Sequence, residues 1–163
     1  MTVALIALLA FVVMEPVTYA VHRWVMHGFA LGWHRSHHAP PTGRFERNDL
    51  FPVCFSAVGV TLFALASAGV SVLWPVAVGV TAYGAAYLLV HDVFIHHRLP
   101  VRLPRLAYLS WVRDAHADHH TTGAEPYGML LPLVRGAPSA TTSPSRARDV
   151  LDRASRRSAR ARL

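Results

Sequence analysis

Lysine is absent from this chain of 163 residues, cysteine occurs once, and charged residues make up only 15% of the sequence. The single cysteine, Cys54, excludes a disulfide within one chain and a cysteine-rich metal site. It lies in an apolar run, where we expect a small buried hydrophobe. Soluble domains carry charge on about a quarter of their residues, and the mean hydropathy here is +0.31. A length of 163 residues suits a single domain. The shortage of charge indicates that the solvent of this domain is a lipid bilayer.

Three long runs carry almost no charge, and each is long enough to cross a bilayer as a helix, which takes about 20 residues. They are Thr2–Val21, Phe51–Gly69 and Leu73–Val90. Only residues 70–72 separate the last two runs, which predicts a tight helical hairpin, and small residues such as Gly79 allow close helix packing. The first run lacks a basic start and a cleavage site, so we expect a retained membrane helix rather than a signal peptide. The sequence predicts an all-α integral membrane helical bundle with about three transmembrane helices.

All the basic residues are arginines, and they occur in two segments. One extends from Arg23 to Arg47 and the other from Arg98 onward. With three spans, both segments fall on one side of the membrane, which the positive-inside rule assigns to the cytoplasm. The net charge of +7 thus sets topology and does not indicate nucleic-acid binding. We predict a bacterial inner-membrane protein with a membrane domain in residues 1–136 and a basic, disordered cytoplasmic tail in residues 137–163.

Eleven histidines are present, and all of them belong to four short clusters. The spacing H-x4-H followed by H-x2-H-H occurs twice along the chain. The clusters are His22 and His27; His34, His37 and His38; His91, His96 and His97; and His116, His119 and His120. Because His97 breaks the duplication, we place it outside the predicted metal ligands.

The spacings suit metal binding. Residues three and four apart share a helix face, so each H-x2-H-H motif is expected to aim three imidazoles at one point. Residues five apart differ by about 140° around an α-helix, so each H-x4-H pair should lie at a helix end or feed two metals from two sides. Because two spans end at His22 and His91, all four clusters are expected at the cytoplasmic face. Imidazoles in that number are enough for two metal ions, and imidazole suits Fe, Zn, Cu and Ni.

One carboxylate, Glu15, lies within the first span, where such a group is costly and usually functional. It precedes His22 by seven residues, so the two share a helix face. We predict that Glu15 orients an imidazole N–H or acts as an extra ligand, with a structural hydrogen bond between helices as the alternative. Asp49, Asp92 and Asp118 are weaker candidates for the same role behind the ligands.

Six segments between Met14 and Leu133 carry a family resemblance. They are HRWVMHG, GWHRSHH, FERNDLFPV, TAYGAAYLLVHDVFIHHRLP, HADHH and EPYGMLLP. In these segments the chain resembles the β-carotene hydroxylase branch of the fatty acid hydroxylase superfamily. The resemblance implies a membrane enzyme with two iron ions that uses O2 to place hydroxyl groups on the β-ionone rings, turning β-carotene into β-cryptoxanthin and then zeaxanthin. It implies ten ligands: His22, His27, His34, His37, His38, His91, His96, His116, His119 and His120.

The same resemblance implies the partners. Electrons come from a ferredoxin-type donor with its reductase, and the lipophilic carotenoid enters from membrane lipid, with Trp33, Tyr87 and Phe94 as candidate wall residues. Zinc is an alternative metal after expression. The alternatives are a fatty acyl or sterol hydroxylase or desaturase, a carotenoid ketolase, and a non-enzymatic metal transporter or haem-carrying anchor. Span interiors without histidine argue against the haem anchor.

Overall fold

Every regular element in the described part of the chain is a helix. The computed structural model describes residues 2–40, 43, 45–101, 103–104 and 106–133. No β-strand occurs within these residues, which confirms the predicted all-α class. The predicted tail, residues 137–163, lies outside the described residues.

Three helical segments are long and apolar enough to cross a membrane, which confirms the number predicted. In chain order they are Thr2–Phe29, made of α1 (Thr2–Ala20) and the π-helical η1 (Val21–Phe29); Arg47–Ser67, made of the 3-10 turn η2 (Arg47–Asp49) and α3 (Leu50–Ser67); and Leu73–Ile95, made of α4 (Leu73–Tyr87) and the π-helical η3 (Leu88–Ile95). Large apolar side chains on α1, such as Val3 and Leu8, are more than half exposed. Such a surface is suited to lipid.

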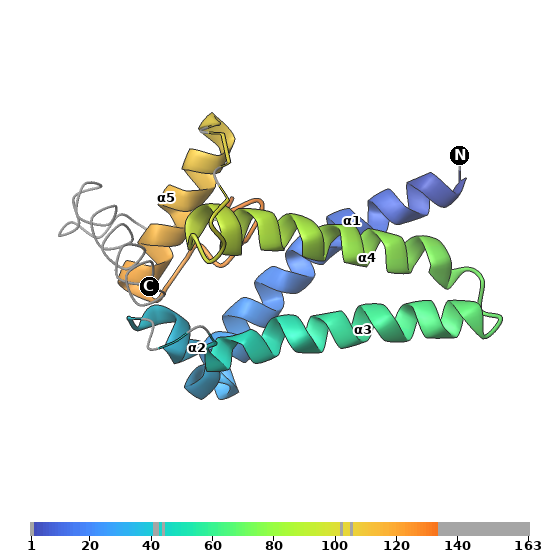
Figure 1. Ribbon diagram of the computed structural model, residues 1–163, viewed down its shortest axis with the longest axis horizontal. Coiled ribbons are helices and arrows are strands. Elements are labelled where there is room, and N and C mark those ends of the chain that lie inside the picture. Colours follow the sequence, from blue (N-terminus) through green and yellow to red (C-terminus); the bar gives the residue numbers. More distant parts are fainter. Residues whose placement is uncertain (1, 41–42, 44, 102, 105, 134–163) are drawn as a thin grey trace.

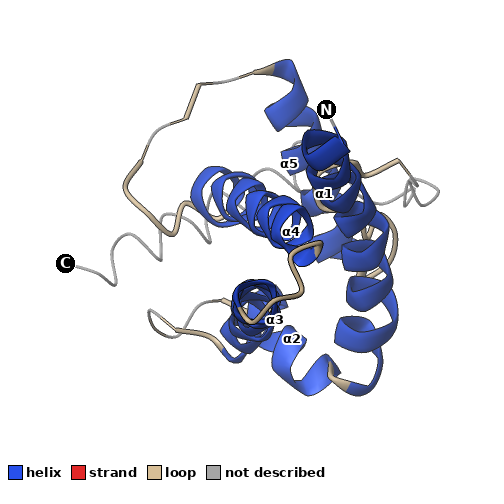
Figure 2. Ribbon diagram, turned by 90° about the vertical axis from the view of Figure 1, so that its right-hand side faces the viewer, coloured by secondary structure: helices blue, strands red, loops and turns tan. Residues whose placement is uncertain are grey.

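The spans form a hairpin that α1 crosses. The predicted hairpin is confirmed, because α3 and α4 lie side by side and are joined by the short segment 68–72. The N-terminus and this turn lie at one end of the molecule, whereas α2 (Leu31–His38) and α5 (Ala107–Thr122) lie at the other (Figure 1). α1 packs against α4, as the end-on view in Figure 2 also shows. The histidine-bearing elements therefore share one end of the bundle.

The helix α5 differs from what its sequence predicts. The amphipathic stretch Leu103–His120 predicts an interfacial helix with Leu106, Leu109, Trp111 and Val112 turned to the membrane. Instead, Leu109 and Val112 are 8% and 1% exposed and belong to a core with Phe94 and Leu130. The prediction is wrong for Leu109 and Val112 because α5 packs on η3 and these side chains meet protein. Leu106 is 54% exposed.

Cys54 also differs from its prediction, since its side chain is exposed rather than buried. It lies on α3, where apolar residues occur all round the helix and only part of the surface contacts other helices. In a membrane span an apolar position therefore does not distinguish a core-facing side chain from a lipid-facing one.

Gly79 sets the distance between α1 and α4. A Cβ atom at Gly79 would lie 2.2 Å from the carbonyl oxygen of Ala7 and 2.7 Å from the Cβ of Ala10. The two backbones therefore meet only because residue 79 has no side chain. Gly84, on the same helix, has nothing within 4 Å of the equivalent point.

We predict that Gly79→Ala lowers the apparent unfolding temperature of the detergent-purified protein by several degrees. Overpacking costs about 1–3 kcal/mol, and here the obstructing atoms belong to backbone. The matched variant Gly84→Ala should be neutral or stabilising, because alanine favours a helix over glycine by about 1 kcal/mol. Equal shifts in the two variants would contradict the close approach.

Candidate metal centre

Ten of the eleven histidines meet in two adjoining clusters. Cluster 1 comprises His22, His27, His34, His38 and His119, whose ligand atoms all lie within 4.8 Å of one another. Cluster 2 comprises His37, His96, His116 and His120, which meet the same limit, together with His91, whose Nε2 lies 3.1 Å from that of His37. The clusters adjoin where the rings of His38 and His120 stack at 4.3 Å. His97 is exposed and belongs to neither.

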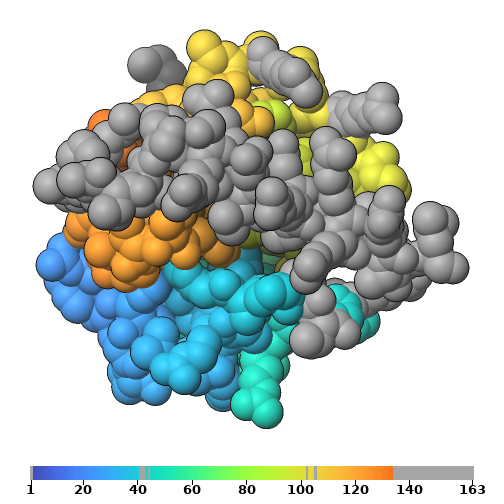
Figure 3. Space-filling model, turned by 90° about the vertical axis from the view of Figure 1, so that its left-hand side faces the viewer, coloured from blue at the N-terminus to red at the C-terminus, as the bar shows by residue number. Residues whose placement is uncertain are grey.

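The end of the molecule that carries the clusters is built from distant parts of the sequence. Figure 3 views this end, where the residues of η1 and α2, in blue to cyan, lie against α5 and the residues that follow it, in orange. Six of the ten imidazoles are at most 8% exposed: His22, His34, His37, His91, His116 and His119. The fold thus encloses a polar centre within an otherwise apolar protein.

Both H-x4-H pairs lie on π-helical turns. The ring centroids of His22 and His27 are 5.1 Å apart in η1, and those of His91 and His96 are 4.6 Å apart in η3. The backbone N–H of His96 donates to the carbonyl oxygen of His91 at 3.0 Å, which is the five-residue hydrogen bond of a π-helix. The pairs do lie where spans end, as predicted. The alternative of two metals fed from two sides is wrong, because it assumed α-helical geometry.

Each H-x2-H-H motif divides its imidazoles between the clusters. His34 and His38 join cluster 1, whereas His37 joins cluster 2. In the same way His116 and His120 join cluster 2, and His119 joins cluster 1. The predicted convergence of three rings on one point is wrong. Residues four apart differ by only about 40° around an α-helix, while adjacent residues differ by about 100°.

In four of the imidazoles, the ring nitrogen that points away from its cluster forms a hydrogen bond. In each, an Nδ1–H donates to an oxygen atom of the protein. The pairs are His22 to the Tyr127 carbonyl at 2.9 Å, His119 to the Ala124 carbonyl at 2.6 Å, His34 to Asn48 Oδ1 at 2.7 Å, and His91 to Asp92 Oδ1 at 2.9 Å. A neutral imidazole has one N–H, so a proton on Nδ1 leaves the lone pair on Nε2.

The inward nitrogens are Nε2 atoms that meet in pairs at 3.0–3.1 Å. The pairs are His22–His34, His34–His38 and His27–His119 in cluster 1, and His37–His91 and His96–His116 in cluster 2. His22 and His34 face each other with two lone pairs, which repel unless a cation lies between them. Nitrogen ligands at about 2.1 Å from an ion and at right angles to each other lie about 3 Å apart. The donor set fits one divalent metal ion in each cluster.

Burial keeps the imidazoles beyond the spans neutral. Desolvation lowers the pKa of His34 to about 3, that of His119 to about 3 and that of His38 to about 4. It also takes the pKa of His37 and His116 well below the usual value, and neighbouring imidazoles lower both further. Because metals bind the neutral imidazole, the clusters are suited to take up cations at neutral pH.

The three predicted aspartates lie in different surroundings. Asp92 accepts a hydrogen bond from the ring of His91, as a residue that orients a ligand should. Asp49 forms an ion pair with Arg98, the second residue after His96. Asp118 is exposed, although it lies inside a histidine motif. Only Asp92 contacts an imidazole directly among these hydrogen bonds.

Glu15 is fixed by the backbone that follows α5. Its carboxylate accepts hydrogen bonds from the Tyr83 hydroxyl at 2.6 Å and from the backbone N–H groups of residues 129–131 at 2.9–3.1 Å. Its hydrogen-bond partners within the described residues are therefore not imidazoles. The structure supports the structural role that stood as the alternative, with Glu15 tying the segment after α5 to the middle of α1.

Two residues that lie next to the imidazoles were not predicted from the sequence. Asn48 is 3% exposed and holds the ring of His34. Glu46 Oε2 lies 3.5 Å from Nδ1 of His37, it has no hydrogen-bond partner among the described residues, and desolvation raises its pKa. The available signal was the polar run ERND directly before a span. The contacts of Asn48 with His34 and of Glu46 with His37 join residues on either side of a loop, so the spacing of residues along a helix does not predict them.

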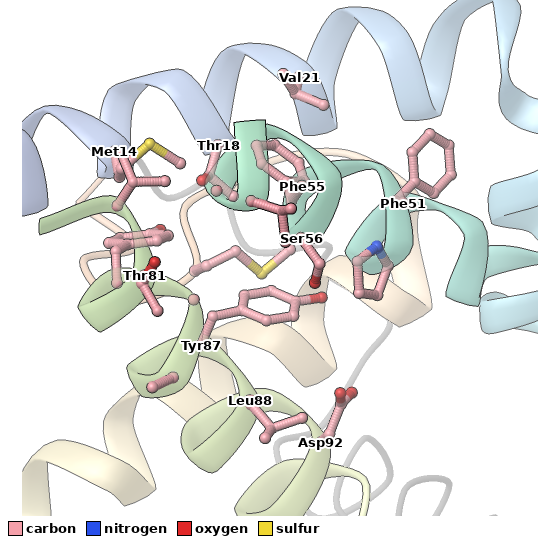
Figure 4. Close-up of a pocket in the computed structure, with 18 of the residues that line it drawn as sticks. Met14, Thr18, Val21, Phe51, Phe55, Ser56, Thr81, Tyr87, Leu88 and Asp92 are labelled. Carbon is pink, nitrogen blue, oxygen red and sulfur yellow. The ribbon is translucent and has the colours of Figure 1, made fainter. Parts of the chain in front are cut away.

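A pocket of about 470 Å³ lies between α1, α3 and α4, beside the clusters. In Figure 4, Met14 and Thr18 from α1, Phe55 from α3 and Tyr87 from α4 line it, and Asp92 lies toward one end. The pocket extends along α3 as far as Phe63. Its lining is almost entirely apolar, which suits a lipophilic ligand.

The pocket and cluster 2 share a wall. The ring of Tyr87, a predicted wall residue, lines this pocket and stacks on that of His91, with centroids 4.7 Å apart. Trp33 and Phe94, the other two predicted wall residues, do not line this pocket. Trp33 packs on Phe51 outside the pocket lining, and Phe94 belongs to the buried core.

Comparisons with known proteins point in one direction. Residues 7–134 match the family model described as fatty acid hydroxylase. A protein named beta-carotene hydroxylase from Pseudescherichia vulneris is 44% identical over 118 residues, which are 72% of this chain and 67% of that protein. Another of that name from Pantoea ananas is 41% identical, over 78% of this chain and 75% of its own length. A chloroplastic beta-carotene 3-hydroxylase from Haematococcus lacustris is 36% identical, over 72% of this chain and 39% of its own. No solved structure matches.

We predict that the protein, purified without a histidine tag and loaded with metal, holds two ions per chain. His22→Ala combined with His34→Ala should leave one ion, because these rings face each other in cluster 1. Elemental analysis of protein of known concentration measures the ratio.

The control variant for metal content is His97→Asn. His97 lies outside both clusters and has a positive φ of 50°, which asparagine tolerates. His97→Asn should keep both ions. Two ions in the double variant would show that cluster 1 is not a metal site.

Proposed function

The chain belongs to the fatty acid hydroxylase family, and from this premise we propose that it is a membrane monooxygenase that hydroxylates the rings of cyclic carotenoids, with β-carotene as substrate. The names of its relatives support the substrate. The observation that carries the proposal is the contact between an apolar pocket and cluster 2 through Tyr87 and Asp92. A ring bound in that pocket has its reacting carbon beside the metal centre.

The pocket suits one end of a long apolar molecule that stays in the bilayer. Its volume of about 470 Å³ lies in the range of small-molecule pockets, about 300–1,000 Å³. The residues around it come from all three membrane spans. We propose that the ring and the adjoining chain enter sideways from lipid, since a carotenoid has no useful concentration in water.

We assign one iron ion to each cluster, with the ten clustered histidines as ligands. Imidazole is a suitable donor for iron, and the close Nε2 pairs support two ions. When bound, the iron ions supply the redox chemistry by which O2, two electrons and two protons convert a ring C–H into C–OH and water. We propose a ferredoxin-type protein with its reductase as the electron source, acting at the cytoplasmic face.

The chain's own residues contribute position and exclusion of water. Asn48, Asp92 and the carbonyls of Ala124 and Tyr127 fix which nitrogen of each ring faces inward. Glu15 ties down the segment that carries those carbonyls. Fixed ligands and an apolar pocket hold a C–H bond in register with the centre.

The test is expression in a bacterium that accumulates β-carotene, followed by chromatography and mass analysis of the pigments. We expect monohydroxylated and dihydroxylated products. His37→Ala and His119→Ala should abolish these products while the protein still accumulates in the membrane. Each variant removes a proposed metal ligand from one cluster, and no other histidine can take its place. His97→Asn should leave product formation unchanged.

The same assay separates the alternatives. A product mass that shows a ketone in place of a hydroxyl would identify a ketolase. Unchanged β-carotene, with the protein present and an electron donor supplied, would contradict the carotenoid assignment. An altered profile of membrane fatty acids or sterols would then identify the other enzymes of the family.

A further inference from the structure

The groups that lie next to the Nδ1 atoms of the imidazoles differ in charge between the two clusters. In cluster 1 the Nδ1–H groups of His22, His34 and His119 donate to two backbone carbonyls and one amide oxygen, all neutral. In cluster 2 the acceptor of His91 is the carboxylate of Asp92, at 2.9 Å. The Nδ1 of His37 lies 3.5 Å from a carboxylate oxygen of Glu46. The difference does not follow from the ligands, which are five imidazoles in each cluster.

Other charged groups nearby leave this difference in place. Beside cluster 2, Asp49 is paired with Arg98, so the carboxylates of Glu46 and Asp92 supply an excess of two negative charges. Beside cluster 1, the carboxylate of Glu125 is paired with Arg23 at 2.8 Å. The guanidinium of Arg23 therefore offsets the charge of that carboxylate.

A carboxylate behind an imidazole changes the ligand itself. It draws the Nδ1 proton toward the oxygen and increases the electron density on Nε2, which strengthens the bond to a metal. A neutral carbonyl does this less. The effect is large in a buried site, where charges are poorly screened. The carboxylates of Glu46 and Asp92 also balance the charge of one divalent ion in cluster 2. The acceptors around cluster 1 are neutral and do not balance the charge of a buried ion.

We infer that the two metal sites are unequal, with cluster 2 the tighter site, and that Glu46 and Asp92 are the positioning residues that make it so. The inference rests on the proposed binding of one metal ion by each cluster. It gives a role to Oε2 of Glu46, an atom that has no hydrogen-bond partner among the described residues. Cluster 2 is also the site that adjoins the pocket, so the tighter ion lies nearer the substrate.

The experiment is a titration of metal-free, detergent-purified full-length protein with Co2+ in the presence of a competing chelator. Bound Co2+ is measured by absorbance. The unaltered protein should bind two ions in two steps whose affinities differ by tenfold or more. Glu46→Gln and Asp92→Asn keep the side-chain shapes and remove the charge. Each should weaken the tighter step by about tenfold or more and leave the weaker step unchanged.

Asn48 provides the matched changes in cluster 1. Asn48→Ala should weaken only the weaker step. Asn48→Asp places a carboxylate behind His34 and should strengthen that step toward the affinity of the other. This gain of affinity tests the inference even where a cluster 2 variant fails to fold.

Two results would overturn the inference. One is a pair of indistinguishable steps in the unaltered protein. The other is an equal weakening of both steps by Glu46→Gln or Asp92→Asn. Fewer than two bound Co2+ ions in the unaltered protein would instead overturn the two-metal assignment, and this inference with it.

Discussion

The close approach of ten imidazoles is the constraint on which the rest of this structure depends. Ten imidazoles direct nitrogen atoms toward two points, and neighbouring Nε2 atoms lie 3.0–3.1 Å apart. His22 and His34 both present a lone pair to each other, and a cation in cluster 1 would relieve their repulsion. Metal uptake would then be coupled to folding of this end of the bundle. The hairpin, the crossing of α1 and the packing of α5 all serve to bring four distant segments to this place.

A second layer keeps the rings from turning. The segment from Ala124 to Leu131 contributes two carbonyl acceptors to cluster 1 and three N–H groups to Glu15. It has no regular secondary structure, so these contacts replace the backbone hydrogen bonds that a helix would make. Glu15 in the first span therefore supports the metal centre indirectly. It fixes the backbone segment whose carbonyl oxygens accept hydrogen bonds from the rings of His22 and His119.

The sequence predicted the class of fold, the three spans, the hairpin and the gathering of the histidine motifs at one end. These features follow from hydropathy, helix length and the placement of arginine, all of which are local. It did not predict that His37 and His119 serve the opposite cluster, because that depends on how two helices lie relative to each other. Nor did it predict the π-helical turns at His22 and His91, since no residue type specifies them.

The residues behind the ligands were the least predictable. Asp92 could be suggested because it adjoins His91 in sequence. Asn48 and Glu46 reach their imidazoles across a loop, and nothing in a linear pattern indicates that contact. Leu109 and Cys54 were misplaced for a related reason. An apolar residue suits lipid and protein interior equally well, so composition alone cannot tell which of the two it meets.

The exchange of one imidazole between the two halves of the chain makes each half incomplete. Residues 22–38 give four rings to cluster 1 and one to cluster 2, while residues 91–120 give four to cluster 2 and one to cluster 1. The pattern is that of two similar units that have traded a ligand, as swapped dimers trade a strand or a helix. Neither unit alone carries a full set of donors, so a fragment that ends at the hairpin turn is left with an open coordination shell at both points.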